Sequence, residues 1–538
     1  MPSQFSLWLY PLLLFSLLAL VMRVRLGLAW AWGFILQVLA IGACAILGLS
    51  VGPDWFFAPL GWVLFVLFAV IPRILLSRLD TCVSLLRANQ AIDYAHKLKF
   101  FYWGQPGQFW IDMTRANALF LERRVDEALE ILSSWEKKDI PKAVRDVVHT
   151  YRLSGHAVLG QWQEIVDEYE AAAADSAKVS HRLSLAASRA YLEVGNADQA
   201  AHTLEKSELS ESRASTKSVA LTLLPYFALL GAIPETEKMF SVGDSGKMAL
   251  PEYVKLYWLA RCQVAAGKLS EAKVQFLKCF DLIKEQSGPA NWQARVQNQL
   301  DRVSNEEIVP VSGNVPEAVK RGWHIFDQCE FVERVIFPRK TPFVVIALIT
   351  LILLTEVAVN HTGHLTQSSF FLAGHLQAER VMQGEWWRLI SYLFLHAHIS
   401  HALLNVIGLF WFGKMAVNIY GPGRFVFIYF ATGILSGMSH VLLVPAMPAV
   451  GASGAMMGIF GAVAAGIWRL KDRLPRGVRQ QELSWMFGLA LAQVVLDHFL
   501  PHVASMAHLG GLVFGFLIGI LLQPQRKTKL SVVVQEAA

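Results

Sequence analysis

One serine lies in a glycine-rich stretch, GASGAMMGIFGA, at residues 451–462. Pro445 and Pro448 precede it, so we expect a loop that enters a helix near Gly451 and places Ser453 in or just before the first helical turn. Backbone N–H groups there lack helical partners, and the positive end of the helix dipole favours a developing oxyanion. The same glycines also suit close helix packing, so this stretch alone leaves a structural role open.

A histidine could supply the base that such a serine needs. His508 lies in the stretch MAHLGGLVFG, and Gly511 and Gly515 share its helix face. A histidine within an apolar span is costly and therefore predicts a functional role. A serine hydroxyl within ~3 Å of an imidazole is the minimal activated nucleophile. A hydrogen bond that only joins two helices is the alternative interpretation of His508.

Further polar side chains crowd one end of another span, in HAHISHALLN: His396, His398, His401 and Asn405. His401 and Asn405 share a helix face, and imidazole N–H and amide groups are suitable donors for an oxyanion hole. Three histidines so close together could also bind a metal ion. No HExxH arrangement follows and no cysteine lies near, so we expect neither a metal nor another cofactor.

The elements that must position these side chains are strongly apolar. The chain has 538 residues, 54% of them hydrophobic, and a mean hydropathy of +0.40, which is too apolar for a soluble protein. Residues 1–79 contain about three runs near the ~20 residues that a spanning helix needs, and residues 343–522 contain about six. A signal peptide explains the first run poorly, because no Lys or Arg precedes it.

Basic residues alternate with neutral connections along the second apolar block. Lys414 and Arg424 lie between its second and third spans, and further Lys and Arg residues lie between its fourth and fifth spans and after its sixth, whereas residues 445–451 and 499–505 carry none. The positive-inside rule then places the C-terminus and the region between the blocks in the cytoplasm, and Ser453 near the outer side. We expect a multi-pass protein of the lipid bilayer, in a bacterial inner membrane.

Residues 80–335 are polar and contain a repeated pattern. Each repeat has a turn position, a second position five residues later and a large apolar residue four residues after that. The second position recurs every 35–37 residues, at Ala128, Ile165, Ala200, Thr236 and Ala272. This spacing is typical of the second helix of a helical hairpin. The segment resembles tetratricopeptide repeats, and an ordinary helical bundle is the alternative. We expect a protein or peptide partner here, and no nucleic acid.

Four motifs in order resemble those of rhomboid intramembrane serine proteases: EWWR, HAHISHALLN, GASG and AHLGGLVFG, all within residues 340–525. The resemblance implies a six-helix core with a Ser–His dyad that cuts peptide bonds in or beside the transmembrane segments of protein substrates. By position, Ser453 would be the nucleophile and His508 the general base. His401, Asn405 and the Ser453 backbone N–H would form the oxyanion hole.

The resemblance also assigns structural roles near the site. Trp387 and Arg388 would stabilise the loop after the first core helix. The remaining residues expected to shape the site are Gly451, Gly454, Met457, Gly511 and Gly515. Two positions depart from the family pattern, because Met457 replaces a common aromatic residue and Asn418 a common glutamate. Asp497 ends the fifth span, and we expect it to be an interfacial residue rather than a third catalytic group.

The sequence thus predicts an all-α polytopic membrane protein in four parts: an N-terminal transmembrane block at 1–79, a cytoplasmic helical-repeat domain at 80–335, a rhomboid-like core at 340–525 and a basic-then-polar tail at 526–538. A catalytically silent scaffold that binds membrane proteins is the alternative function. The presence of both Ser453 and His508 favours the enzyme. A transporter is disfavoured, because no paired broken helices with intramembrane acids occur.

Overall fold

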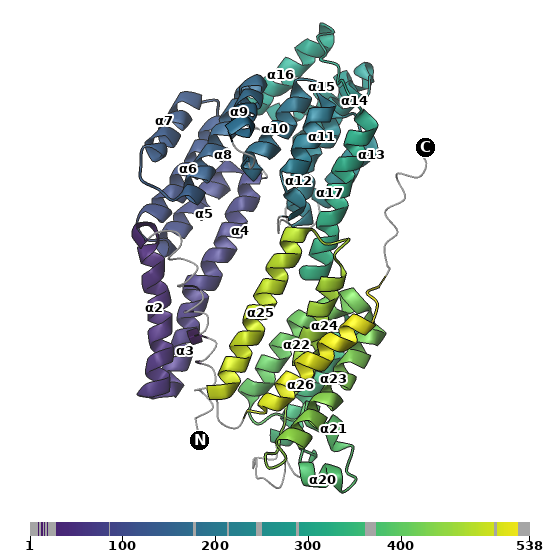
Figure 1. Cartoon of the computed structure of the whole chain (residues 1–538). Coiled ribbons are helices and arrows are strands. Elements are labelled where there is room, and N and C mark those ends of the chain that lie inside the picture. The colour runs from purple at the N-terminus through teal and green to yellow at the C-terminus, as the bar shows by residue number, and fades with distance from the viewer. Residues whose placement is uncertain are drawn as a thin grey trace. The chain divides into compact units, whose positions relative to one another are not determined.

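The computed structural model is helical over the residues it describes, as expected for the all-α class (Figure 1). Apart from a few single residues near the N-terminus, the described ranges are 28–84, 87–175, 179–211, 215–243, 250–286, 290–360, 373–499 and 503–525. The first expected span, at 5–22, lies mostly outside these ranges, and the tail at 526–538 lies wholly outside them.

The chain divides into two compact units. The first comprises residues 1–209 and 214–326, and the second comprises 210–213 and 327–538. The division falls inside the helix α17 (Val315–Ile336) and does not separate the N-terminal block from the helical region. The four-part organisation expected from the sequence therefore stays a prediction.

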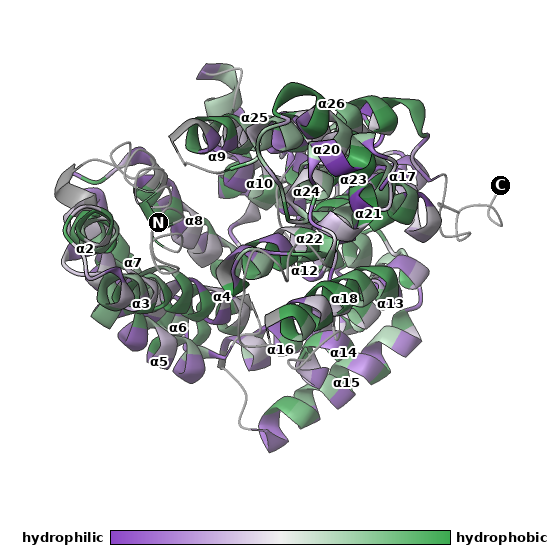
Figure 2. Cartoon of the chain, turned by 90° about the horizontal axis from the view of Figure 1, so that it is seen from below, coloured by the Kyte–Doolittle hydropathy of each residue, from purple (hydrophilic) through white to green (hydrophobic). Residues whose placement is uncertain are grey.

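Two of the three expected N-terminal spans are described. The first is α2 (Leu28–Ser50), and the second runs without interruption through α3 (Asp54–Phe65), a π-helical turn (Val66–Val70) and α4 (Ile71–Ser84). Hydrophobic residues dominate both α2 and α3 (Figure 2). Within the described ranges, four helices are long and apolar enough to cross a membrane: Trp32–Ser50, Asp54–Val83, His401–Tyr420 and Pro422–Leu443. These helices are those of a multi-pass membrane protein.

Helical hairpins follow along the first unit. After α5 (Ala88–Phe101), the paired helices are α6 (Gln105–Leu121) with α7 (Val125–Glu136), α8 (Lys142–Leu159) with α9 (Trp162–Asp175), α10 (His181–Glu193) with α11 (Ala197–Lys206), α12 (Thr216–Leu229) with α13 (Ile233–Gly243), and α14 (Glu252–Ala265) with α15 (Leu269–Glu285). The helices α16 (Ala290–Ser304) and α17 complete the unit as far as the division.

The repeat pattern of the sequence coincides with the turns of these hairpins. The turn position has a positive φ in every pair: Arg123 (63°), Gly160 (74°), Gly195 (90°), Gly231 (72°) and Gly267 (77°). Glycine adopts this left-handed conformation without steric cost, which explains its recurrence. The residue five positions later is buried in each pair. The period was therefore interpreted correctly, while membership of the tetratricopeptide class stays a prediction.

Buried charges join two hairpins within this unit. Glu193 of α10 accepts a hydrogen bond from Arg261 of α14 at 2.8 Å, and Arg189 lies 3.6 Å from the same carboxylate. The Arg189 guanidinium also stacks between the rings of Trp162 and Trp258. Burial lowers the pKa of Arg189 to about 10. Burial alone would raise the pKa of Glu193, but the two guanidinium groups outweigh it and lower that pKa.

An extended segment after α16 lies against the turn between α10 and α11. Ser312 donates its backbone N–H to the Gly195 carbonyl at 2.7 Å and accepts the N–H of Ala197 at 2.9 Å. Asn314 donates its backbone N–H to the Asp198 carboxylate at 2.9 Å. The turn thus binds a stretch of extended backbone through main-chain hydrogen bonds.

The second unit contains a helix at each of the six spans expected for the core. They are α18 (Phe343–Asn360), α22 (Ile399–Tyr420), α23 (Pro422–Leu443), α24 (Ser453–Arg469), α25 (Arg476–Phe499) and α26 (Ser505–Leu521). Two short helices, α20 (Ala378–Met382) and α21 (Arg388–Ser391), lie in the loop after α18. Lys414, expected between two spans, lies inside α22 with its ammonium over the Phe410 ring.

Glycines bring α24 and α26 into backbone contact. A methyl group at Gly511 would overlap the Gly454 carbonyl oxygen, and one at Gly515 would overlap the Gly458 carbonyl oxygen. Each residue therefore has to be glycine for the two helices to approach as they do. The same approach brings the N-terminal turns of both helices together, where Ser453 and His508 lie.

We expect Gly515→Ala to destabilise the protein by about 1–3 kcal/mol, because the added methyl group meets backbone that cannot rotate away. The thermal unfolding midpoint in detergent micelles, followed by circular dichroism, measures the effect. Gly488→Ala is the matched control: its methyl group would meet nothing within 4 Å, so the midpoint should stay unchanged or rise. Equal midpoints for the two variants would contradict the proposed backbone contact.

Candidate active site

The loop before α24 determines where Ser453 lies. Ala449 and Leu376 exchange two backbone hydrogen bonds of 2.9 Å, as in a short antiparallel bridge. Two residues further on, the Gly451 N–H donates to the Tyr392 carbonyl at 2.9 Å. These contacts join the loop to the segment between α18 and α22, so the start of α24 is held from outside its own helix.

Two histidines complete this support. The His396 Nε2 accepts the backbone N–H of Ala452 at 3.3 Å, and the His440 Nε2 donates to the Met447 carbonyl at 2.7 Å. The motif containing His396 suggested an oxyanion hole or a metal site, whereas the structure shows this ring holding the loop. Sequence reasoning missed His440, although a histidine within a span was a signal that could have identified it.

Gly451 has a special backbone conformation beside the site. Its φ is +127°, in the region that favours glycine. A Cβ atom there would lie 2.7 Å from Cε1 of His401, so the imidazole of α22 packs directly against the loop. Glycine at position 451 therefore permits both the turn and the close approach of His401.

Ser453 and His508 form a direct hydrogen bond. The distance between the serine Oγ and the histidine Nε2 is 2.7 Å, and the residues come from the first turns of α24 and α26. The structure thus brings together two residues that are 55 positions apart in the chain. This is the geometry in which an imidazole can accept the hydroxyl proton.

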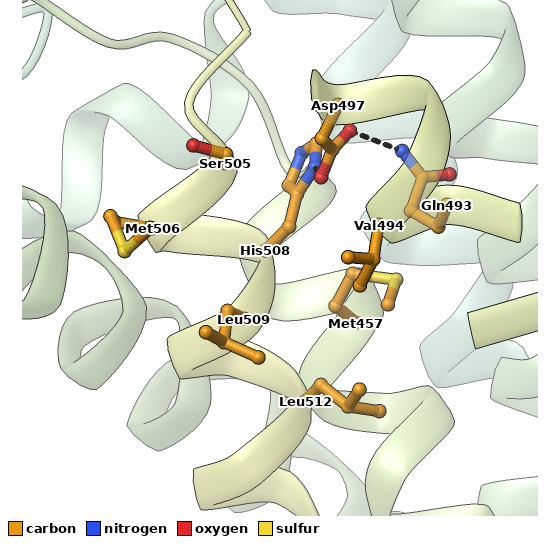
Figure 3. Close-up of a pocket in the computed structure, with 9 residues that line it drawn as sticks. All are labelled: Met457, Gln493, Val494, Asp497, Ser505, Met506, His508, Leu509 and Leu512. Carbon is orange, nitrogen blue, oxygen red and sulfur yellow. Dashed lines mark hydrogen bonds and ion pairs between the residues drawn. The ribbon is translucent and has the colours of Figure 1, made fainter. Parts of the chain in front are cut away.

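The other nitrogen of the same imidazole also has a partner. His508 Nδ1 lies 2.7 Å from the Asp497 Oδ2, and the Gln493 side-chain amide donates to Asp497 Oδ1 at 2.7 Å (Figure 3). Asp497 is buried, with 8% of its surface exposed. The expectation of a merely interfacial residue is therefore wrong, because the carboxylate points at the imidazole.

A cavity of about 400 Å³ opens beside this group (Figure 3). Its polar wall comprises Gln493, Asp497, Ser505 and His508. Its apolar wall comprises Met457, Val494, Met506, Leu509 and Leu512. Met457 thus lines the same cavity as His508. Many members of the family that the sequence resembles carry an aromatic residue at this position. A space of this size can hold water or an apolar side chain next to the imidazole.

The residues expected to form the oxyanion hole lie close to this site, but not all point at it. His401 packs on Gly451, as described above. The Asn405 amide donates to the carbonyl of His401 within its own helix at 3.1 Å, which uses one of its two amide protons. Because α24 begins at Ser453, the first N–H groups of this helix have no partner within it.

Arg388 and Trp387 lie in the loop after α18. Arg388 is 3% exposed and donates to the Glu385 carboxylate at 2.5 Å and to the His375 carbonyl at 3.0 Å. The Trp387 ring lies 4.7 Å from the Arg388 guanidinium and covers Gly374. The Asn418 side-chain amide donates a hydrogen bond to the Lys414 carbonyl of its own helix.

The residues that the structure describes include no group of three His, Cys, Asp or Glu side chains placed to hold a metal ion. The site itself offers a hydroxyl, an imidazole and a carboxylate group. A hydroxyl hydrogen-bonded to an imidazole can act as a nucleophile on a carbonyl group.

Part of the chain is similar to known proteins. Residues 383–525 match the model of the rhomboid domain. The chain is 34% identical over 151 residues to "Putative rhomboid protease YdcA" of Bacillus subtilis, which covers 28% of this chain and 73% of that protein. It is 27% identical over 191 residues to "Rhomboid protease GluP" of the same organism, covering 35% of this chain and 37% of that protein.

A plant protein is also similar to part of the chain. "RHOMBOID-like protein 6, mitochondrial" of Arabidopsis thaliana is 35% identical over 159 residues, which covers 28% of this chain and 50% of that protein. The match spans half or less of the length of this relative and of GluP. The match to the rhomboid domain, at residues 383–525, lies within the second unit.

Proposed function

The chain belongs to the rhomboid family, and we propose on this premise that it is an intramembrane serine endopeptidase. Its substrates are membrane proteins, cut at peptide bonds in or beside their transmembrane segments. The observation that carries the proposal is the 2.7 Å hydrogen bond between Ser453 Oγ and His508 Nε2. The names of the relatives, which describe rhomboid proteases, support the same reaction.

Acylation begins at the serine. Oγ attacks the carbonyl carbon of the scissile peptide bond while His508 Nε2 takes the hydroxyl proton. The imidazolium then returns this proton to the leaving amine, and the first product departs. The acyl group stays on Ser453 as an ester, so the N-terminal part of the substrate remains bound until water arrives.

The tetrahedral intermediate carries a negative charge that needs donors. The first backbone N–H groups of α24, which lack partners within the helix, can supply them, and the helix dipole adds a positive potential there. We assign His401 and the second amide proton of Asn405 as side-chain donors. This assignment rests on the packing of His401 against Gly451 and on the family motif.

Hydrolysis of the ester needs water within an apolar unit. The cavity of about 400 Å³ beside His508 provides room for it. His508 activates the water as it activated the serine, and collapse of the second intermediate releases the acid. A helical substrate must unwind first, because a helix shields its scissile carbonyl groups; small residues at the cut would make that easier.

A catalytically silent scaffold is the alternative. In that case the second unit would only bind membrane proteins, and no nucleophile would be required. The direct Ser453–His508 hydrogen bond favours the enzyme, since a scaffold has no need for a hydroxyl aligned with an imidazole inside a helix bundle.

The orientation in the membrane follows from the basic residues. We propose that the first unit beyond α4 and the residues after α26 are cytoplasmic, in a bacterial inner membrane, with the start of α24 near the opposite face. The concentration of Lys and Arg between α24 and α25, at residues 469–479, supports this orientation.

We further propose that the tetratricopeptide-like helical hairpins recognise a peptide or protein partner. The observation that supports this role is the extended segment at Ser312, whose backbone hydrogen-bonds along the turn at Gly195. A surface that holds one extended strand of its own chain through main-chain hydrogen bonds has the geometry to hold another. The cytoplasmic tail of a substrate is the partner that this location favours.

Ser453→Ala and His508→Ala should each reduce cleavage of a transmembrane model substrate in proteoliposomes by at least about 10⁴-fold. The double variant should be no less active than either single variant, because the two residues act as one unit. His401→Ala should cost about 10²–10³-fold, as expected for one oxyanion donor. Ser505→Ala is the matched control, because this serine lines the same cavity and should retain full activity. Full activity of Ser453→Ala would refute the serine protease.

Reporter fusions test the proposed orientation. Fusions after Glu285 and after Lys529 should report the cytoplasmic side, and a fusion after Pro448 the opposite side, because basic connections stay inside. Alkaline phosphatase and green fluorescent protein fusions at the same positions give complementary signals. A cytoplasmic signal from the Pro448 fusion would reverse the face on which substrates are cut.

Deletion of residues 92–300 tests the recognition role. The variant should cleave a generic transmembrane substrate at the wild-type rate per folded molecule, while quantitative membrane proteomics should show fewer cellular proteins cut, because the docking surface is lost. The folded amount is measured by labelling with a serine-directed phosphonate. If cleavage of the generic substrate and of all cellular substrates falls only with the folded amount, the hairpins are structural.

A further inference from the structure

A segment of extended backbone lies against one turn of the hairpins in the first unit. This strap, residues 307–314, follows α16, and its Ser312 forms a parallel bridge with Asn196. A Cβ atom at Gly195 would lie 2.7 Å from the Pro310 carbonyl oxygen, so the strap can approach only because this residue has no side chain. The turn is therefore shaped to receive extended backbone.

The strap is attached to the turn by hydrogen bonds rather than by buried side chains. In addition to the main-chain bonds of Ser312, its hydroxyl donates to the Gly195 carbonyl at 2.7 Å. The apolar side chains of the strap are only partly covered: Val309 is 46% exposed, and Val311 is half-buried. Hydrogen bonds at an exposed edge contribute little net free energy, because water offers the same groups other partners. A chain that buries more apolar surface can therefore displace the strap.

A cavity of about 380 Å³ lies between the strap and the ends of the neighbouring helices. Its apolar wall includes Leu229 and Leu230 at the end of α12, Val264 of α14 and Leu269 of α15, and the strap contributes residues 308–311. Protein interiors are close-packed, and cavities that bind ligands have volumes of ~300–1,000 Å³. The side chains of the strap thus leave room for a bulkier apolar group.

The buried charges of the cavity are paired with each other. Arg261 donates to the Glu193 carboxylate at 2.8 Å, and their side chains are only 11% and 5% exposed. At the outer rim, the Arg302 Nε donates to the Glu307 carbonyl of the strap at 3.3 Å. A ligand does not have to bring a charge to satisfy these groups. The cavity therefore favours an uncharged apolar side chain, and the adjacent turn favours extended backbone.

We propose that this cavity and the turn at Gly195 form a peptide-binding site, which the strap occupies until a partner displaces it. The ligand is an extended segment that carries a bulky apolar side chain, such as leucine or phenylalanine. Its backbone replaces that of the strap in the hydrogen bonds with Gly195 and Ala197, whatever its sequence, and its side chain fills the cavity and provides the specificity. The proposal rests on the recognition role proposed above for the hairpins, with the cytoplasmic tails of substrates as partners.

Peptide binding to the full-length protein in detergent micelles tests the site. The probes are three fluorescein-labelled octapeptides: the strap sequence EIVPVSGN, the same sequence with Val311→Phe and the same sequence with Val311→Ser. Fluorescence anisotropy should show the Phe peptide binding at least about tenfold more tightly than the Ser peptide, because it buries more apolar surface. Ser312→Pro in the protein removes the N–H that binds the Gly195 carbonyl, and should raise the affinity for the Phe peptide by at least about tenfold because the strap is released.

Two substitutions in the wall distinguish a binding site from an unused void. Ala265 is exposed and lines the cavity, so Ala265→Phe should weaken binding of the Phe peptide by at least about tenfold without lowering the thermal unfolding midpoint. Ala266→Phe is the matched control, because the next residue is also exposed but does not line the cavity, and should bind as wild type.

Three results would overturn the site: equal affinities for the Phe and Ser peptides, wild-type binding by Ala265→Phe, or a Ser312→Pro variant with a lower unfolding midpoint and no gain in affinity. In the last case the strap would only be a structural brace. Faster deuterium exchange of the Ser312 amide in the presence of saturating Phe peptide would support displacement.

The same measurements separate this site from the proposals made above. The expected order of peptide affinities, together with an unchanged range of cleaved proteins after deletion of residues 92–300, would support the site and overturn substrate tails as its partners. A narrowed range in that deletion, together with wild-type peptide binding by Ala265→Phe, would support the recognition role and overturn this site. Ser453→Ala should bind the peptides as wild type, so failure of the protease proposal leaves the result unchanged.

Discussion

The close backbone approach of α24 and α26 is the constraint on which the rest of the second unit depends. A hydroxyl and an imidazole are short side chains, so their hydrogen bond can form only if the two helices nearly touch. Gly461, Gly511 and Gly515 permit this contact, because a side chain at any of them would meet the backbone of the other helix. Within a bilayer, apolar side chains gain little from contacting each other instead of lipid, so helix association depends on such close packing. The glycines therefore stabilise the bundle and align the reactive pair at once.

Close packing sets the distance between the helices, but the loop before α24 sets the orientation of the serine. Its backbone is held by Leu376 and Tyr392, from the segment between α18 and α22, and by His440 of α23. Arg388 in turn holds the loop that carries Leu376, through the adjacent carbonyl of His375. A nucleophile held in this way loses little freedom when a substrate binds, which lowers the entropic cost of reaching the transition state. The loop residues can thus affect the rate without contacting the substrate.

Local patterns in the sequence predicted what local chemistry determines. Ser453 lies beside glycines that mark its helix start, and the turns at Gly195 and Gly267 recur with a fixed period, so both were found. Asp497 was interpreted wrongly, because its contact with His508 depends on how α25 packs against α26, and no spacing encodes that packing. His396 and His440 are visible in the sequence as histidines in or next to a span, but each holds the loop through a single backbone group, and no spacing predicts that partner. Lys414 lies inside α22 and not in the connection expected for it. Its long side chain can bury its apolar part there while the ammonium contacts the Phe410 ring.

Glycine has different physical roles in the two units, and this difference follows from their surroundings. In the hairpins of the first unit, Gly160 and Gly231 adopt positive φ at turns, and burial of apolar side chains from water stabilises the helices on either side. In the second unit, Gly458 and Gly515 lie within helices, where only their lack of a side chain matters. The first role produces glycines one repeat apart, and the second produces them three or four residues apart on one helix face. The spacing of a single residue type therefore indicates which of these two roles it has in each unit.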